Sequence, residues 1–262
     1  MSKKITNRIF CYKKLFLIVN ILSIISCNSN HLPEVVKYFP NSKIIQSKGY
    51  YFNDTPVGTL TTFDSLGNIS TIEQYDSMGL LYGRYVSFMS NGDTDQIRYY
   101  KMDKLNGITT SYKNNKITES AFFLNDKQVG NSYFYDSLGK CNFYNFLDFN
   151  GDGIIADDYE KDSFHSHRIF FLDSVISKED KNDSSQWQIA FLISKPPNSS
   201  TDLFIEQLMD SVKPINKKYI NIEEEYFIYT IKFPKNSELK ITGNQTTQEN
   251  KHKTLIQIWK PK

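Results

Sequence analysis

The feature that most restricts the fold of this chain is an internal repeat with a period of 23 to 25 residues. A glycine opens each copy, and an aromatic residue follows that glycine by five positions. Repeats of this length build architectures in which each unit packs against the units before and after it. The glycines are Gly58, Gly83, Gly107 and Gly130, and the aromatic residues are Phe63, Phe88, Tyr112 and Tyr135.

Further glycines divide each repeat. Gly67, Gly92 and Gly139 stand four residues after an aromatic residue, and the shorter third repeat has Asn114-Asn115 instead. Glycine, and less readily Asn or Asp, adopts positive φ at low cost. The sequence therefore predicts turns at these positions and also at the four glycines that open the repeats.

Between these glycines, the segments are short and rich in β-branched and aromatic residues, which favours strands. Each repeat therefore predicts one β-hairpin, and the series predicts an antiparallel β-meander. We expect the repeated aromatic residues to pack in the core of the sheet, because cross-strand aromatic pairs stabilise sheets.

This pattern resembles the variant MORN repeat over about residues 44–147, with four copies and a partial copy before them. The resemblance implies an all-β fold of stacked hairpins. Proteins with such repeats are often grouped as antitoxin-like, which implies an immunity function as one alternative. The original MORN repeat has another glycine two positions after the first, where this chain has Leu60, Tyr85, Thr109 and Ser132.

The N-terminus has the pattern of an export signal. Five basic residues precede an apolar run that is too short to span a membrane, and the run ends at Cys27. Ile24-Ile25-Ser26-Cys27 resembles the bacterial lipobox. This resemblance implies a signal peptide over residues 1–26, diacylglycerol and palmitate on Cys27, and a lipidated tether over residues 27–43. The expected location is the cell envelope, lipid-anchored, at the outer membrane.

Removal of the signal changes the charge and the cysteine count. It leaves 26 basic and 29 acidic residues, so the net charge becomes −3 and gives no reason to expect a nucleic-acid partner. Cys141 is then the one cysteine besides the lipidated Cys27, so no intramolecular disulfide is expected.

The repeat ends in a segment that resembles a calcium loop. Asp148, Asn150 and Asp152 stand at positions 1, 3 and 5, and Ile154 would contribute its carbonyl at position 7. Tyr159 occupies position 12, where a bidentate acidic ligand is usual, so the sequence predicts weak calcium binding completed by Asp158 or Glu160. The alternative is a hairpin loop without a metal.

We assign residues 148–166 to this loop and a linker, and residues 167–262 to a second domain. Six short strand-like segments, one of them Tyr219–Phe233, predict an immunoglobulin-like β-sandwich. The apolar alternation within residues 188–193 is incomplete, which indicates a strand covered on both faces.

Motifs for catalysis are missing from the sequence. It contains no GxSxG, no phosphate-binding glycine loop and no HExxH. We therefore expect a non-enzymatic envelope lipoprotein that binds another protein or an envelope component through its repeat sheet, with no catalytic residues. The alternatives are an antitoxin or immunity protein that neutralises a partner toxin, and a hydrolase with a site between the two domains.

Overall fold

The structure is a computed structural model that describes residues 32–158, 172–178, 186–209, 213–221, 226–232, 237–247 and 252–259. These residues form strands and connecting turns, and they include no helix. The first eleven strands are β1 (Glu34–Tyr38), β2 (Ile45–Phe52), β3 (Thr55–Phe63), β4 (Ile69–Tyr75), β5 (Gly83–Phe88), β6 (Thr94–Lys101), β7 (Lys104–Lys113), β8 (Lys116–Leu124), β9 (Lys127–Tyr135), β10 (Cys141–Leu147) and β11 (Gly153–Asp158).

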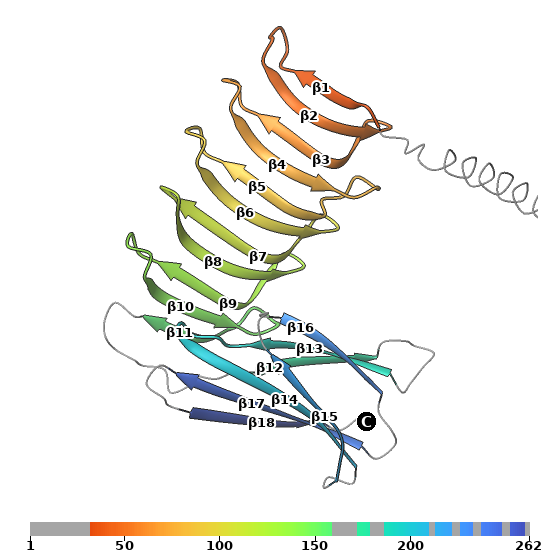
Figure 1. Cartoon of the computed structure of the whole chain (residues 1–262), viewed down its shortest axis with the longest axis vertical. Coiled ribbons are helices and arrows are strands. Elements are labelled where there is room, and N and C mark those ends of the chain that lie inside the picture. The colour runs from red at the N-terminus through yellow and green to blue at the C-terminus, as the bar shows by residue number, and fades with distance from the viewer. Residues whose placement is uncertain are drawn as a thin grey trace, which may run out of the picture.

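These eleven strands form one antiparallel sheet in which every strand pairs with the next strand in the sequence. The sheet rises as a stack of hairpins in Figure 1. The predicted meander is therefore confirmed. The sheet also continues beyond residue 147, because β11 pairs with β10 from Phe143↔Asp158 to Leu147↔Gly153.

Two-residue turns close four of the hairpins. Both residues of each pair have positive φ, as a type I′ turn requires, and this turn suits the right-handed twist of paired strands. The pairs are Asn53-Asp54, Met102-Asp103, Asn114-Asn115 and Asn125-Asp126. Asn and Asp tolerate this conformation through local hydrogen bonds, whereas Met102 is strained in it.

A five-residue turn that begins with aspartate recurs at other hairpin ends. In the first example, Oδ1 of Asp64 accepts hydrogen bonds from the backbone N–H groups of Leu66 and Asn68, both at 2.9 Å. The fourth residue is a glycine with positive φ, as predicted for Gly67 and Gly139. The same bonding recurs in the turns that begin at Asp76, Asp136 and Asp148.

The glycines that open the repeats do not lie in turns, so that part of the prediction is wrong. Gly58, Gly107 and Gly130 lie inside strands, and Gly83 begins one. All four have positive φ. The pairing register shifts where Gly58, Gly107 and Gly130 face the neighbouring strand. They form β-bulges that need a left-handed residue, which explains why glycine recurs there.

The repeated aromatic residues are half-buried, so they do not form the core that we expected. Elsewhere in the sheet, neighbouring side chains bury single residues such as Val86, which is 3% exposed, but a cluster of large buried side chains needs a second layer. That condition is met near the β11 end of the sheet, where the buried cluster lies. The cluster comprises Phe122, Val129, Tyr144, Phe146 and Ile155 of the repeat sheet together with Leu192 of the second domain.

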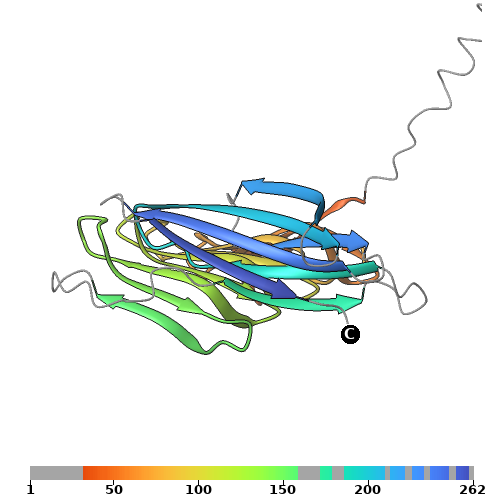
Figure 2. The same ribbon diagram turned by 90° about the horizontal axis from the view of Figure 1, so that it is seen from below.

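The second domain is a β-sandwich of two sheets. One has the strand order β12-β13-β16 and the other has the order β15-β14-β17-β18, so the chain alternates between sheets as in immunoglobulin-like folds. Seen from below, the sandwich lies in front of the repeat sheet (Figure 2). The strands are β12 (Leu172–Lys178), β13 (Gln186–Ile193), β14 (Ser199–Met209), β15 (Lys213–Asn221), β16 (Tyr226–Lys232), β17 (Ser237–Thr247) and β18 (His252–Trp259).

Two strands occupy the range Tyr219–Phe233, where the sequence predicted one. The earlier strand, β15, pairs with β14, whereas the later strand, β16, pairs with β13 in the other sheet. Strand propensity is high on both sides of the division, so it does not reveal where the chain crosses between the sheets.

Strand β13 is covered on both faces at its end, as its incomplete alternation predicted. Phe191, Leu192 and Ile193 are consecutive and fully buried. Successive side chains point to opposite faces of a strand. Leu192 packs into the buried cluster of the repeat sheet, so Phe191 and Ile193 face the interior of the sandwich.

Candidate binding surface

One face of the repeat sheet carries a regular series of side chains beside the four glycines that open the repeats. On the neighbouring strand, Tyr50 lies closest to Gly58, Gln74 to Gly83, Tyr99 to Gly107, and Phe122 contacts Gly130. We call each of these pairs a rung and the face that they share the ladder face. A rung side chain can lie over its neighbour because glycine has no Cβ there.

The first three rungs are open to solvent. Within 4 Å of the position of a Cβ at Gly58, Gly83 or Gly107, the nearest atoms all belong to the side chain of the same rung. Tyr50 is 40% exposed and Tyr99 is 41% exposed. Ile108, which follows the third glycine, is 40% exposed. This face therefore presents aromatic and aliphatic surface to solvent.

The fourth rung is covered by the β-sandwich. A Cβ on Gly130 would lie 3.4 Å from Cδ2 of Leu192 and 3.8 Å from Cδ1 of Phe122. Phe122 is 8% exposed and Leu192 is fully buried. An aliphatic side chain of the sandwich thus packs on a glycine and an aromatic ring of the ladder face.

Buried hydrogen bonds orient the sandwich at this rung. The side chain of Asn131 donates to the backbone carbonyl of Ile193 at 2.9 Å and accepts from the backbone N–H of Lys195 at 2.7 Å. The Tyr144 hydroxyl also donates to Oδ1 of Asn131, at 2.7 Å. Beside them, the Tyr133 hydroxyl donates to the carbonyl of Lys195 at 2.8 Å. These hydrogen bonds form only when the sandwich is docked in one position on the repeat sheet.

The opposite face of the sheet carries a polar network. Glu73 accepts hydrogen bonds from the hydroxyls of Thr71 and Tyr75 on the same strand. Burial, followed by the hydrogen bond to Glu73, raises the pKa of Tyr75. Arg98 lies over the Tyr85 ring, 5.8 Å from its centroid. The hydrogen bonds to Glu73 thus lie within β4, whereas the contact of Arg98 with Tyr85 joins β6 to β5.

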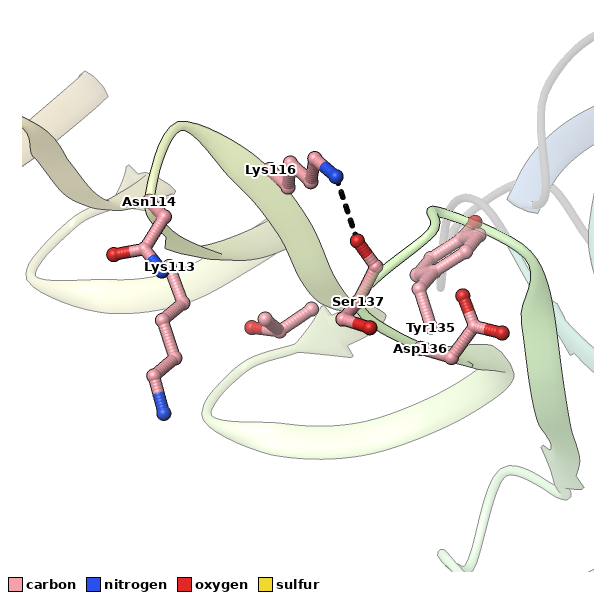
Figure 3. Close-up of a pocket in the computed structure, with 7 residues that line it drawn as sticks. Lys113, Asn114, Lys116, Tyr135, Asp136 and Ser137 are labelled. Atoms are coloured by element: carbon pink, nitrogen blue, oxygen red, sulfur yellow. Dashed lines mark hydrogen bonds between the residues drawn. The ribbon is translucent and has the colours of Figure 1, made fainter.

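A hollow of about 580 Å³ lies between two neighbouring hairpin turns, at the ends of the strands that these turns connect (Figure 3). Lys113, Asn114 and Lys116 line it from the β7–β8 turn, and Tyr135 and Asp136 line it from the β9–β10 end. Nζ of Lys116 donates to the carbonyl of Ser137 at 2.7 Å, which links the two turns. The lysine side chains are exposed to solvent, so the hollow resembles a gap between turns more than a built pocket.

The predicted calcium residues lie at the hairpin between β10 and β11. Oδ1 of Asp148 accepts the backbone N–H groups of Asn150 and Asp152 at 2.8 and 2.9 Å, as the other aspartate turns do. Ile154 is nearby at the start of β11, whereas Asp158 pairs with Phe143, about 17 Å along the strand from Gly153. The structure therefore does not bring Asp158 to this turn.

Two other predicted site residues, Glu160 and Cys27, lie outside the described residues. Within the described ranges, no group of three or more His, Cys, Asp or Glu side chains is placed to hold a metal ion. Calcium binding therefore stays a prediction. Cys141 is half-buried in β10, and burial raises the pKa of its thiol, which disfavours the thiolate.

The ladder face was missed at the level of sequence, although its signal is present. A rung residue stands eight or nine positions before each glycine that opens a repeat, as Tyr50, Gln74, Tyr99 and Phe122 do. Its chemical type varies, and the contact with glycine arises only when the two strands pair.

No protein-family model matches the chain, and none of the curated proteins matches it. The described part of the chain contains no helix with the length and apolar character that a membrane span requires.

Proposed function

We propose that this protein is an envelope lipoprotein that acts without catalysis, as a binding or assembly module, through the ladder face of its repeat sheet. One observation supports the proposal most directly. Four equivalent rungs line one face, and the one covered rung, at Gly130, receives Leu192 of the sandwich. The open first and third rungs, at Tyr50 and Tyr99, likewise offer an aromatic side chain to another molecule.

The anchor in this proposal is Cys27, within the sequence Ile24-Ile25-Ser26-Cys27. β1 begins at Glu34, inside the range 27–43 that the sequence analysis gives to the tether, so the tether can comprise only the residues before Glu34 and would reach at most about 25 Å. The sheet would then stand close to the membrane surface with β1 nearest to it. An anchored sheet with a bare face is suited to capturing a neighbouring envelope component.

Anchoring is tested by Cys27→Ser in the full-length chain. We expect this variant to remain as an unprocessed precursor that incorporates no labelled palmitate. A variant that is still cleaved and acylated contradicts the lipoprotein assignment, whatever the ladder face binds.

Binding is tested by placing a photo-crosslinking amino acid at Tyr99 in the native envelope and identifying adducts by mass spectrometry. The matched control carries the same amino acid at Leu138, an exposed residue at a hairpin tip away from the ladder face. We expect a defined adduct at Tyr99 and none at Leu138. Equal labelling at both positions, or none at Tyr99, contradicts binding through this face.

A further inference from the structure

The covered rung shows which chemistry the ladder face accepts. Leu192, an aliphatic side chain of a β-sandwich, contacts Phe122 and the Cα side of Gly130. The next rung along the sheet pairs Tyr99 with Gly107 and continues at Ile108. These residues expose a ring and an aliphatic side chain on adjacent strands, which lie about 4.8 Å apart. An open surface of the same type is therefore continuous with an interface that the chain already uses.

The sandwich has a second aliphatic surface. Among its described side chains, the large hydrophobic residues that are exposed are Ile256, at 55%, and Ile258, at 58%. Both belong to β18, one of the two edge strands of the four-stranded sheet. They are two residues apart, so their side chains lie on one face of that strand, about 7 Å from each other.

Charge does not oppose contact at this patch. Lys240 pairs with Ile258 across β17 and β18, and its ammonium group forms a 3.1 Å salt bridge with Glu206. The neighbouring exposed residue on the same face of β18 is Thr254, which is uncharged. On the open rung, Tyr99 and Ile108 offer aromatic and aliphatic surface to such a patch. The exposed Arg84, which pairs with Tyr99 across β5 and β6, lies at the border of this surface.

We propose that the open third rung of one copy of this protein binds the β18 face of a second copy, with Ile256 and Ile258 packing on Tyr99 and Ile108. This inference rests on the proposed function, because it names the partner of the ladder face. The two surfaces differ and lie on different domains. The contact is therefore heterologous, and each copy keeps one free surface for a further copy.

The test uses two full-length copies with different C-terminal tags, co-expressed and isolated through one tag. One variant carries Tyr99→Lys with Ile108→Lys, and the other carries Ile256→Lys with Ile258→Lys. All four residues are exposed, so the substitutions leave the folded core unchanged, and thermal unfolding checks this. Lysine is used on both surfaces so that the altered faces repel rather than attract each other.

Wild-type copies should co-isolate, and each variant paired with itself should show a loss of recovery on the order of tenfold or more. The two variants mixed should recover each other as a one-to-one pair and form nothing larger, because one intact contact remains. Unaffected recovery, no wild-type recovery, or failure of the mixed pair overturns the inference. Adducts of Tyr99 with a different protein, without self-association, would leave the proposed function standing.

Discussion

The side-chain amide of Asn131 in the repeat sheet donates a 2.9 Å hydrogen bond to the backbone carbonyl of Ile193 in the sandwich, across 62 residues of sequence. Its oxygen accepts from the Lys195 N–H and the Tyr144 hydroxyl. Asn131 is fully buried, so these partners replace water completely. One side chain thereby joins the repeat sheet to the sandwich through hydrogen bonds.

We predict that Asn131→Ala destabilises the docked domain by about 3 kcal/mol, because buried donors and acceptors lose their partner. Urea unfolding followed by the fluorescence of Trp187 and Trp259 measures the loss. Amide exchange at Lys195 should also accelerate. Thr59→Ala, at the equivalent and exposed position of the first repeat, is the control and should cost under about 1 kcal/mol. Equal effects at the two positions would show that Asn131 does not join the domains.

Met102→Asn should stabilise the protein by about 1 kcal/mol. Met102 has a φ of 53° in a turn whose equivalents in other repeats have Asn, and Asn tolerates that conformation better. The reciprocal change, Asn114→Met at a φ of 52°, should destabilise by a similar amount. Thermal unfolding measures both variants. The two substitutions should change the melting temperature in opposite directions. A change in the same direction would contradict the argument that Met102 is strained.

Gly107→Ala should destabilise more than Gly92→Ala. A Cβ at Gly107 would meet Cβ of Tyr99 at 3.0 Å, with φ at 131°, whereas Gly92 has nothing within 4 Å and a φ of 87°. We expect about 3 kcal/mol at Gly107 and about 1 kcal/mol at Gly92. Chemical denaturation compares them, and a larger loss at Gly92 would show that Tyr99 does not lie over the bulge.

Stability should fall as the pH rises above about 10, partly through Tyr75. Burial and the hydrogen bond to Glu73 raise the pKa of Tyr75 above its ordinary value of 10.0. Below that pH, the folded and unfolded chains are both protonated and the contribution is complete. Above it, the unfolded chain releases the proton first, so unfolding is favoured. Tyr75→Phe should weaken this pH dependence, whereas Tyr82→Phe, at an exposed tyrosine, controls for loss of a hydroxyl. An unchanged alkaline slope would contradict the prediction.

The turn at Asp148 allows the calcium prediction to be separated from a structural role. In chelator, we expect Asp148→Ala and Asp136→Ala to lower the melting temperature similarly, because each loses two backbone hydrogen bonds to a carboxylate. The calcium prediction adds that millimolar calcium raises the melting temperature of Asp136→Ala but not of Asp148→Ala. If neither wild type nor Asp136→Ala responds to calcium in calorimetry or thermal unfolding, the calcium prediction is wrong and the role of Asp148 is structural.

The repeat shows how far local chemistry determines this fold. Period, hairpins and the turns at Gly67, Gly92 and Gly139 could be predicted, because positive φ and strand propensity depend on residues close in sequence. The same reasoning was wrong for Gly58 and Gly107, since a bulge needs positive φ as a turn does. A bulge can be told from a turn only when the neighbouring strand with which it pairs is known.

Tertiary structure alone decided which surface is covered. Phe122 and Tyr99 occupy equivalent rungs, yet one is buried and the other is 41% exposed, because Leu192 packs on the first. That contact joins residues 70 positions apart and depends on where the sandwich docks. The sequence by itself determined a stack of hairpins followed by a sandwich. The open ladder face exists because a cluster of large buried side chains forms on this single-layer sheet only where another layer reaches it.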